Sequence, residues 1–180
     1  MAPSRLHEQP TNRPVAVDLF CGAGGMSLGF EQAGFDVLLA VDKDPHHVAA
    51  HHRNFPYGVT LHKSVAEITG KEILERLGHR EISLVFGGPP CQGFSTMGLR
   101  DEADPRNSLV AEFCRIVDEL KPKAFVMENV TGMSSGSTAE HYALALSRFQ
   151  ASGYRICSPV RALNALDFGV PQNRKRLIII

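Results

Sequence analysis

Short apolar runs alternate along the chain with stretches whose apolar positions recur every three to four residues. The apolar runs predict strands at residues 15–20, 35–41, 59–62, 82–86, 124–127, 154–162 and 177–180. The other stretches predict helices at residues 26–33, 45–54, 73–77, 109–120 and 142–149. Strands that alternate with helices favour an α/β fold with a mostly parallel sheet and helices on both faces. A ligand of such a sheet is expected beyond the carboxyl ends of the strands.

The two ends of the chain frame this predicted domain. Residues 1–14 contain three prolines and lack the apolar stretch of a signal peptide, so we expect a flexible arm before a domain at residues 15–180. The chain stops inside the apolar run 177–180, without a turn or a polar tail. Because domains seldom end in a bare strand, we expect a fold that is incomplete at its C-terminus, as in a truncated chain or one part of a split protein.

Composition narrows the class of protein. The 180 residues are 43 % hydrophobic and 21 % charged, which is typical of a globular domain, and no apolar run could span a membrane. The four cysteines form no C-x-x-C pair, which favours a reduced, cytoplasmic protein over a disulfide scaffold or a zinc site. The formal net charge of zero argues against a free-standing, strongly basic nucleic-acid binder.

A glycine-rich segment follows the first predicted strand. Residues 18–25 read DLFCGAGG, and Asp42 ends the next predicted strand. Glycines allow close approach of a ligand, and an acid after the second strand is placed to bind ribose hydroxyls, although a simple tight turn is the alternative. The spacing is not G-x-G-x-x-G and no G-K-[ST] follows, which disfavours NAD and a nucleoside triphosphate. S-adenosylmethionine fits this pattern better.

A cysteine follows two prolines after the strongest predicted strand, in GGPPCQGFS at residues 87–95. The prolines stiffen the segment, so Cys91 is expected at the carboxyl end of the strand as a nucleophile rather than as a small core residue. Glu128 and Asn129 end the next predicted strand. Because neighbouring parallel strands end at the same edge, Cys91 and Glu128 are expected close together.

Four segments, at residues 18–25, 89–95, 128–130 and 168–176, together resemble the ordered motifs of the C5-cytosine DNA methyltransferases. The resemblance implies a Rossmann-like, S-adenosylmethionine-dependent enzyme that methylates C5 of a cytosine flipped out of duplex DNA. It implies that the Cys91 thiolate adds to C6 while Glu128 engages N3 and the exocyclic amine. Arg176 would hold the glutamate, and Arg174 would support Cys91 and its own loop.

The same resemblance implies the binding residues. Implied cofactor contacts are Phe20, Gly22, Gly24, Gly25, Asp42, Lys43, Ser64, Val65, Pro89 and Leu109. Two of these depart from the family pattern, because Lys43 replaces a large apolar side chain and Ser64 replaces an aspartate. Implied DNA contacts are Gln92, Ser95, Met97 and Arg100, with Met97 either filling the space of the flipped base or simply lying on the surface.

The resemblance leaves the whole assembly and its substrate partly open. It implies that target recognition and the last family motifs lie in a second chain or a missing C-terminal region. An intracellular, bacterial and nucleoid-associated protein of a restriction-modification system is expected. A tRNA cytosine-C5 methyltransferase and a non-catalytic binding module with the same fold are the alternatives. His47 and His51 are spaced as a metal-binding pair, but no third ligand accompanies them, so we interpret His46, His47, His51 and His52 as a solvated helix face and expect no metal.

Overall fold

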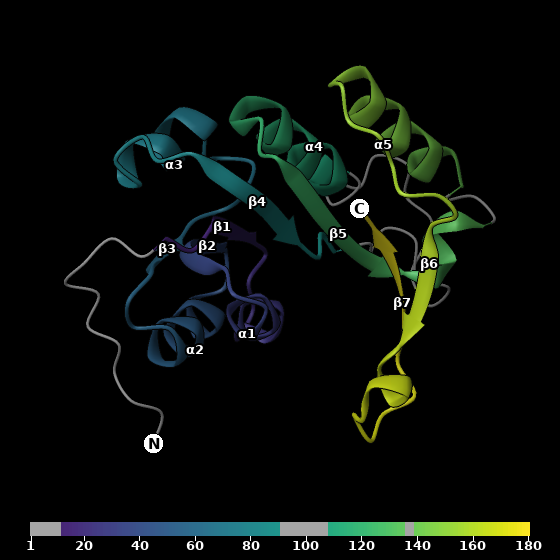
Figure 1. Cartoon of the computed structure of the whole chain (residues 1–180), viewed down its shortest axis with the longest axis horizontal. Coiled ribbons are helices and arrows are strands. Elements are labelled where there is room, and N and C mark those ends of the chain that lie inside the picture. The colour runs from purple at the N-terminus through teal and green to yellow at the C-terminus, as the bar shows by residue number, and fades with distance from the viewer. Residues whose placement is uncertain (1–11, 91–107, 136–138) are drawn as a thin grey trace.

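The computed structural model of the chain describes residues 12–90, 108–135 and 139–180 (Figure 1). The strands are β1 (Val15–Leu19), β2 (Asp36–Asp42), β3 (Val59–His62), β4 (Ile82–Gly87), β5 (Ala124–Val130), β6 (Arg161–Asn164) and β7 (Lys175–Ile179). The α-helices are α1 (Gly25–Gln32), α2 (Pro45–Asn54), α3 (Gly70–Arg76), α4 (Ser108–Leu120) and α5 (Ala139–Ala151). Two 3₁₀-helical turns follow β5 and β6, η3 (Thr131–Ser134) and η5 (Ala165–Phe168).

The strands form a single mixed sheet with the order β3-β2-β1-β4-β5-β7-β6. The first five strands in this order are parallel, and β7 runs antiparallel to both of its neighbours, β5 and β6. The predicted α/β fold with a mostly parallel sheet is confirmed. The strand order reverses direction at β1 and β4, because β2 and β3 lie on one side of β1 and β5 on the far side of β4. Ligands of open α/β sheets bind at such a switch point.

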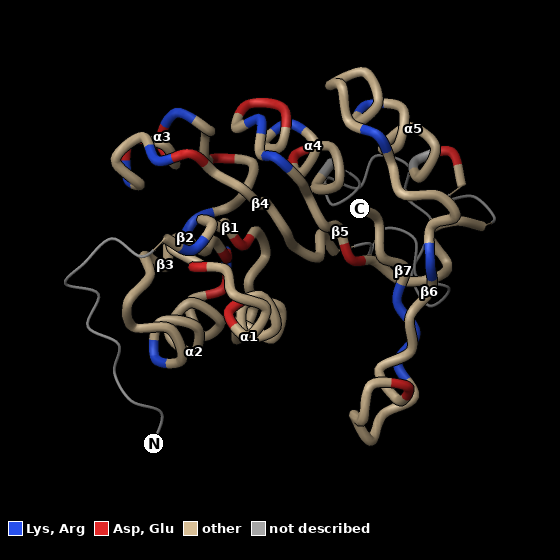
Figure 2. Tube along the Cα trace, in the orientation of Figure 1, with Lys and Arg blue, Asp and Glu red and all other residues tan. Residues whose placement is uncertain are grey.

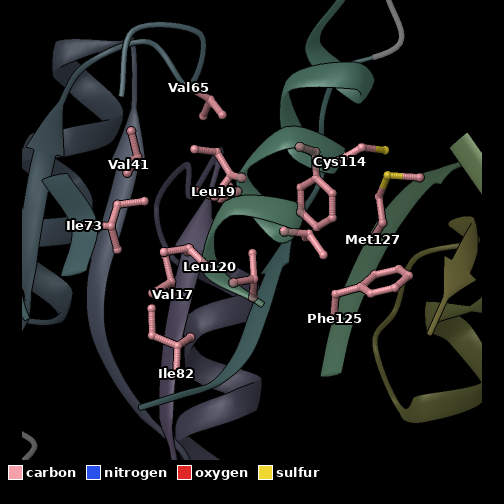
Figure 3. Packing of buried hydrophobic residues seen from close by; sticks show 14 of the residues in the cluster. Val17, Leu19, Val41, Val65, Ile73, Ile82, Cys114, Leu120, Phe125 and Met127 are labelled. Carbon is pink, nitrogen blue, oxygen red and sulfur yellow. The ribbon is translucent and has the colours of Figure 1, made fainter. Parts of the chain in front are cut away.

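Helices cover both faces of the sheet, with α3, α4 and α5 on one face and α1 and α2 on the other (Figure 1). Alternate residues of β1 serve the two faces, since Val17 and Leu19 belong to the larger apolar cluster and Ala16 to the smaller one. Side chains from β1, β2, β4 and β5 meet those of α3 and α4 in the larger cluster (Figure 3). This burial, worth about 1.5–3 kcal/mol for each large apolar side chain, fixes the strands and hence their carboxyl ends.

The structure corrects the predicted strand at residues 154–162. Only Arg161–Asn164 form β6, and the chain before it follows no regular strand. Pro159 has no N–H to donate to a neighbouring strand. The Tyr154 hydroxyl donates instead to the carbonyl of Pro122, between α4 and β5, at 2.7 Å. A single backbone bond from Cys157 N–H to the Ile180 carbonyl joins this segment to the end of β7.

The predicted strand at residues 124–127 is three residues longer in the structure, because β5 continues to Val130. The extension pairs with β7, so that Glu128 lies opposite Ile178 and Val130 lies opposite Arg176. Glu128 therefore lies within a strand and is paired with β7, rather than carried on a loop.

The first described residues are already attached to the domain. Arg13, within the predicted arm, donates to the carbonyls of Glu31 and Phe35 and pairs with the carboxylate of Asp36 at 3.3 Å. The remainder of the arm up to residue 11 lies outside the described residues. No helix in the described part of the chain is long and apolar enough to cross a membrane.

Candidate active site

A cavity of about 290 Å³ opens at the carboxyl ends of β1, β2 and β4. Its lining residues are Phe20, Gly22, Asp42, Lys43, Asp44, His47, Ser64, Val65, Gly88, Pro90 and Leu109. Seven of the ten residues expected to bind the cofactor are in this lining. The other three are Gly24, Gly25 and Pro89, each of which is within three residues of a lining residue in the sequence.

The glycine-rich loop turns sharply between β1 and α1. Phe20, Gly22 and Gly24 all have positive φ angles, of 65°, 53° and 94°. The loop is tied back by hydrogen bonds from Cys21 N–H to the Val41 carbonyl at 3.1 Å and from Gly24 N–H to the Cys21 carbonyl at 2.9 Å. A positive φ at Phe20 is unusual for a residue with a side chain, and here the turn places Phe20 at the cavity.

Asp42 ends β2 with a buried carboxylate at the edge of the cavity. Its Oδ2 accepts a hydrogen bond from Gly22 N–H at 2.9 Å, and its Oδ1 accepts one from Asp44 N–H at 2.9 Å. The Nδ1 atom of His47 lies 3.3 Å from the same Oδ1. A carboxylate held in this way has lone pairs left to accept hydrogen bonds from hydroxyl groups of a ligand.

A buried chain of hydrogen bonds lies beneath the glycine-rich loop and joins four elements. Ser27 of α1 donates to Asp18 Oδ2 of β1 at 2.5 Å, and His51 Nε2 of α2 lies 3.0 Å from the Ser27 hydroxyl. On its other side, His51 Nδ1 lies 2.9 Å from the hydroxyl of Thr60 on β3. The interpretation of the α2 histidines as a solvated face is therefore wrong for His51, which is 2 % exposed.

Burial perturbs both ionisable members of this chain. It raises the pKa of the Asp18 carboxyl to about 8, against the opposing hydrogen bond from Ser27 and with a smaller contribution from the Asp42 charge. Burial also lowers the pKa of His51 to about 4. At neutral pH the chain thus contains a neutral imidazole and a carboxyl group that resists ionisation. Sequence reasoning assigned His51 to a solvated face and missed Ser27 and Thr60, because no motif distinguishes these two from ordinary helix and strand residues.

The far wall of the cavity is formed by Ser64 and Val65 after β3 and by Leu109 of α4. Arg115 of α4 holds this wall in place by donating to the carbonyls of Val65 and Ile68, each at 3.0 Å. The Ser64 hydroxyl accepts a hydrogen bond from Ala66 N–H at 3.3 Å. The wall is therefore mainly apolar, with one small hydroxyl group at its edge.

A second group of polar side chains lies at the same edge of the sheet, on β5 and β7. Glu128 Oε1 is 2.8 Å from Arg176 Nε and 3.8 Å from the Arg174 guanidinium, so the structure brings these three predicted residues together. Gly88, in the cavity lining, packs against Glu128, since a Cβ added there would lie 3.0 Å from Glu128 Oε2. The acid and the cavity are thus adjacent.

Asn129 connects β5 to the proline segment after β4. Its buried side chain donates to the carbonyl of Pro89 at 3.1 Å. This bond fixes the chain direction immediately before Pro90, where the described residues end. The predicted nucleophile and DNA contacts, Cys91, Gln92, Ser95, Met97 and Arg100, lie outside the described residues.

Two of the other cysteines are unsuited to nucleophilic chemistry. Burial raises the pKa of the Cys114 thiol to about 12. Burial, together with the charges of Asp18 and Asp42, also raises the pKa of the Cys21 thiol. Because the thiolate is the nucleophilic form, neither side chain competes with Cys91 for that role at neutral pH.

Charge is distributed unevenly around the site. Figure 2 shows basic residues along β6 and β7, and the sequence identifies them as Arg161, Arg174, Lys175 and Arg176. Near β1, β2 and α1 the charges are mainly acidic, where Asp18, Glu31, Asp36 and Asp42 lie, and around α3 and α4 both signs are mixed (Figure 2). The neutral net charge of the chain therefore conceals a basic end next to Glu128, suited to an anionic polymer.

Comparison with known proteins identifies the family of the chain. The family described as C-5 cytosine-specific DNA methylase matches residues 15–180. The Type II methyltransferase M.XorII of Xanthomonas oryzae pv. oryzae is 52 % identical over 170 residues, which are 93 % of this chain and 40 % of that protein. The Type II methyltransferase M1.HphI of Haemophilus parahaemolyticus is 42 % identical, and the match covers 91 % of this chain and 44 % of that protein.

A solved structure gives the same result for the fold. A protein assigned as a DNA modification methyltransferase encoded within an E. coli prophage superposes with a TM-score of 0.81 at 36 % identity. The match covers 92 % of this chain and 45 % of that protein. The chain thus spans less than half the length of these three relatives.

Proposed function

The chain belongs to the C-5 cytosine-specific DNA methylase family, and from this we propose that it transfers a methyl group from S-adenosylmethionine to C5 of cytosine in DNA. The observation that carries the proposal is the Glu128–Arg176 pair beside Gly88, at the same edge of the sheet as the Asp42 cavity. Such a reaction requires a carboxyl group that contacts the cytosine ring and, next to it, a pocket that binds the nucleoside cofactor.

The residues around the cavity fit S-adenosylmethionine. Asp42 offers carboxylate oxygens to ribose hydroxyls, while Val65 and Leu109 provide apolar contact for a purine ring. A Cβ at Gly22 would meet nothing within 4 Å, so the backbone there faces open space in which a ligand lies close to the loop. When bound, S-adenosylmethionine supplies an electrophilic methyl group.

The proposed chemistry assigns each protein group a separate task. The Cys91 thiolate forms a bond to C6 of the cytosine, and Glu128 provides a proton at N3 as electrons move onto the ring. This addition makes C5 nucleophilic, so C5 forms the new bond to the methyl group while the bond from that methyl group to the sulfonium sulfur breaks and S-adenosylhomocysteine leaves. The N3 proton returns to Glu128. Removal of the C5 proton by a base then restores the double bond and expels the Cys91 thiolate.

Arg176 and Asn129 are proposed to act by position. The Arg176 guanidinium holds Glu128 Oε1 and so orients the carboxyl group, with Arg174 in a supporting place. Asn129 holds Pro89 and thereby the direction of the segment that leads to Cys91. Gln92, Ser95, Met97 and Arg100 are proposed to contact DNA around the flipped base, whose extrusion costs a few kcal/mol.

We propose that target recognition resides outside this chain. The relatives are more than twice as long as the part that this chain matches, and the described basic residues beside Glu128 lie only on and next to β6 and β7. A second polypeptide or further sequence would therefore supply the contacts that read the DNA. On this proposal the 180-residue chain alone binds S-adenosylmethionine weakly and methylates DNA poorly.

The experiment is covalent trapping on 5-fluorocytosine. A pool of duplex oligonucleotides of random sequence containing 5-fluorocytosine is incubated with S-adenosylmethionine and the chain, alone and joined to the C-terminal part of M.XorII. We expect a denaturant-resistant protein–DNA adduct, more abundant with the added part, and none from Cys91→Ser. Cys157→Ser is the matched control and should retain the adduct. An adduct that persists in Cys91→Ser, or that forms on tRNA but not on DNA, would overturn the proposal.

A further inference from the structure

We propose that His47 is a positioning residue for the ribose end of the cofactor, acting by holding the Asp42 carboxylate toward the cavity. No family motif discussed above includes His47. The inference rests on the proposed function, since it concerns how this cavity binds S-adenosylmethionine.

The first turn of α2 places the His47 side chain next to the Asp42 carboxylate. Asp44 caps the helix by accepting hydrogen bonds from the backbone N–H groups of His46 and His47, at 2.8 and 3.4 Å, and Pro45 occupies the first turn. With the first turn fixed, the His47 imidazole lies in the cavity lining with Nδ1 3.3 Å from Asp42 Oδ1. His46, one residue earlier, is exposed and is absent from the lining.

The three contacts of the Asp42 carboxylate are not equivalent. Gly22 and Asp44 donate backbone N–H groups, whose positions are set by the chain itself. His47 contributes the one side-chain contact to Asp42 among the described residues, and it comes from the solvent side, where 53 % of the side chain is exposed. With Nδ1–H as donor, the imidazole stops the carboxylate from rotating toward solvent and leaves its free lone pairs facing the cavity.

The exposure of His47 separates positioning from stability. A side chain more than half exposed contributes little buried area, so its removal should leave the fold intact. Asparagine can place its side-chain amide donor close to where Nδ1 of histidine lies, whereas alanine cannot. His47→Asn is therefore the conservative variant and His47→Ala the disruptive one, with His46→Ala as the matched control.

The test measures binding of S-adenosylhomocysteine, and of its 2′,3′-dideoxy analogue, to the 180-residue chain by NMR titration. We expect His47→Ala to weaken S-adenosylhomocysteine binding about 5- to 20-fold, in line with one charge-assisted hydrogen bond, and His47→Asn and His46→Ala to remain within about twofold of wild type. The dideoxy analogue should bind wild type and His47→Ala equally, because it lacks the hydroxyl groups that Asp42 would accept from.

A structural role would give a different pattern, with both ligands weakened alike by His47→Ala. That result, or an unchanged affinity of His47→Ala for S-adenosylhomocysteine, would overturn the inference and leave the proposed function standing. If wild type binds no S-adenosylhomocysteine at millimolar concentrations, the inference falls, whereas the proposed function is judged separately by covalent trapping on 5-fluorocytosine with the chain joined to the C-terminal part of M.XorII. In Asp42→Asn, adding His47→Ala should cause no further loss, since the two residues act through one carboxylate.

Discussion

Arg176 on β7 places its Nε atom 2.8 Å from Oε1 of Glu128 on β5, while the closest approach of Arg174 to the same oxygen is 3.8 Å. Both partners of the shorter pair are partly buried, with side-chain exposures of 26 % and 23 %. Partial burial reduces screening by solvent, so this pair holds its geometry better than a surface ion pair does. The two arginines of the same segment therefore have unequal control over the orientation of the acid.

The first prediction concerns this difference. In the chain joined to its C-terminal complement, Arg176→Ala should lower the rate of methyl transfer on the order of 100-fold, because Glu128 loses the group that orients it. Arg174→Ala should have a smaller effect, about tenfold or less, since its contact is longer. Single-turnover transfer of labelled methyl groups measures both rates. Arg155→Ala, at an exposed site before β6, is the control, and equal losses in all three variants would contradict the prediction.

The positions of Asp42 and Glu128 could be predicted because each follows an apolar run, and strand ends in a parallel sheet share one edge. The burial of His51 could not be predicted from the sequence. Its i, i+4 spacing from His47 fixes a common helix face but does not say whether that face meets solvent or another element. Here it meets Ser27 and Thr60, which come from elements distant in sequence. Long-range pairing likewise decides the length of β5, whose last residues are strand because β7 lies beside them.

The second prediction concerns the buried carboxyl of Asp18. Its pKa is raised to about 8 in the folded chain from an ordinary 3.8, so the folded state retains a proton that the unfolded state has lost between these values. The resulting stability is fully present below about pH 4 and is lost progressively as the pH rises to about 8. Asp18→Asn removes this dependence. Urea unfolding at pH 4–8 should show the stability of the variant increasing relative to wild type as the pH rises.

Asp167→Asn provides the matched comparison for that series, because Asp167 is an exposed carboxylate on η5. Its stability curve should run parallel to that of wild type over the same pH range. If Asp18→Asn also runs parallel to wild type, Asp18 ionises freely in the folded chain and the prediction is wrong.

The third prediction concerns His51, whose contribution to stability depends on pH in the opposite direction. Burial lowers its pKa to about 4 from 6.5, so the unfolded state binds a proton that the folded state refuses. The contribution of His51 to stability is thus present above about pH 6.5 and is lost as the pH falls to about 4. His51→Gln should lose about 1–2 kcal/mol at pH 7 through its weaker hydrogen bonds. Below pH 6.5 the difference in free energy of unfolding between His51→Gln and wild type should become smaller.

The exposed neighbour His52 supplies the control for this measurement. His52→Gln should stay close to the wild-type unfolding curve, because its side chain is exposed and its charge is the smallest of the causes that act on the pKa of His51. A gap between His51→Gln and wild type that stays constant from pH 7 to pH 4.5 would show that His51 protonates in the folded chain without cost.

The last prediction separates two glycines of the same loop. Gly24 has φ +94°, and a Cβ there would overlap the Phe55 ring and lie 3.0 Å from His51 Cδ2. Gly24→Ala should therefore destabilise the chain by about 2–4 kcal/mol, from backbone strain and crowding together. Gly22 has φ +53° but open space around it, so Gly22→Ala should cost only about 1–2 kcal/mol.

In ligand binding the order of the two variants should be reversed, with Gly22→Ala affected more than Gly24→Ala. Gly22 lines the cavity, so the added methyl group of Gly22→Ala occupies space that the ligand needs and should weaken S-adenosylhomocysteine binding at least about tenfold. Gly24 is absent from the cavity lining and its added Cβ would point toward Phe55 and His51, so the fraction of Gly24→Ala that remains folded should bind more nearly as wild type does. Urea unfolding combined with NMR titration measures both quantities on the same samples. If the same variant shows both the larger loss of stability and the larger loss of affinity, the loop does not divide its two glycines between packing and ligand approach.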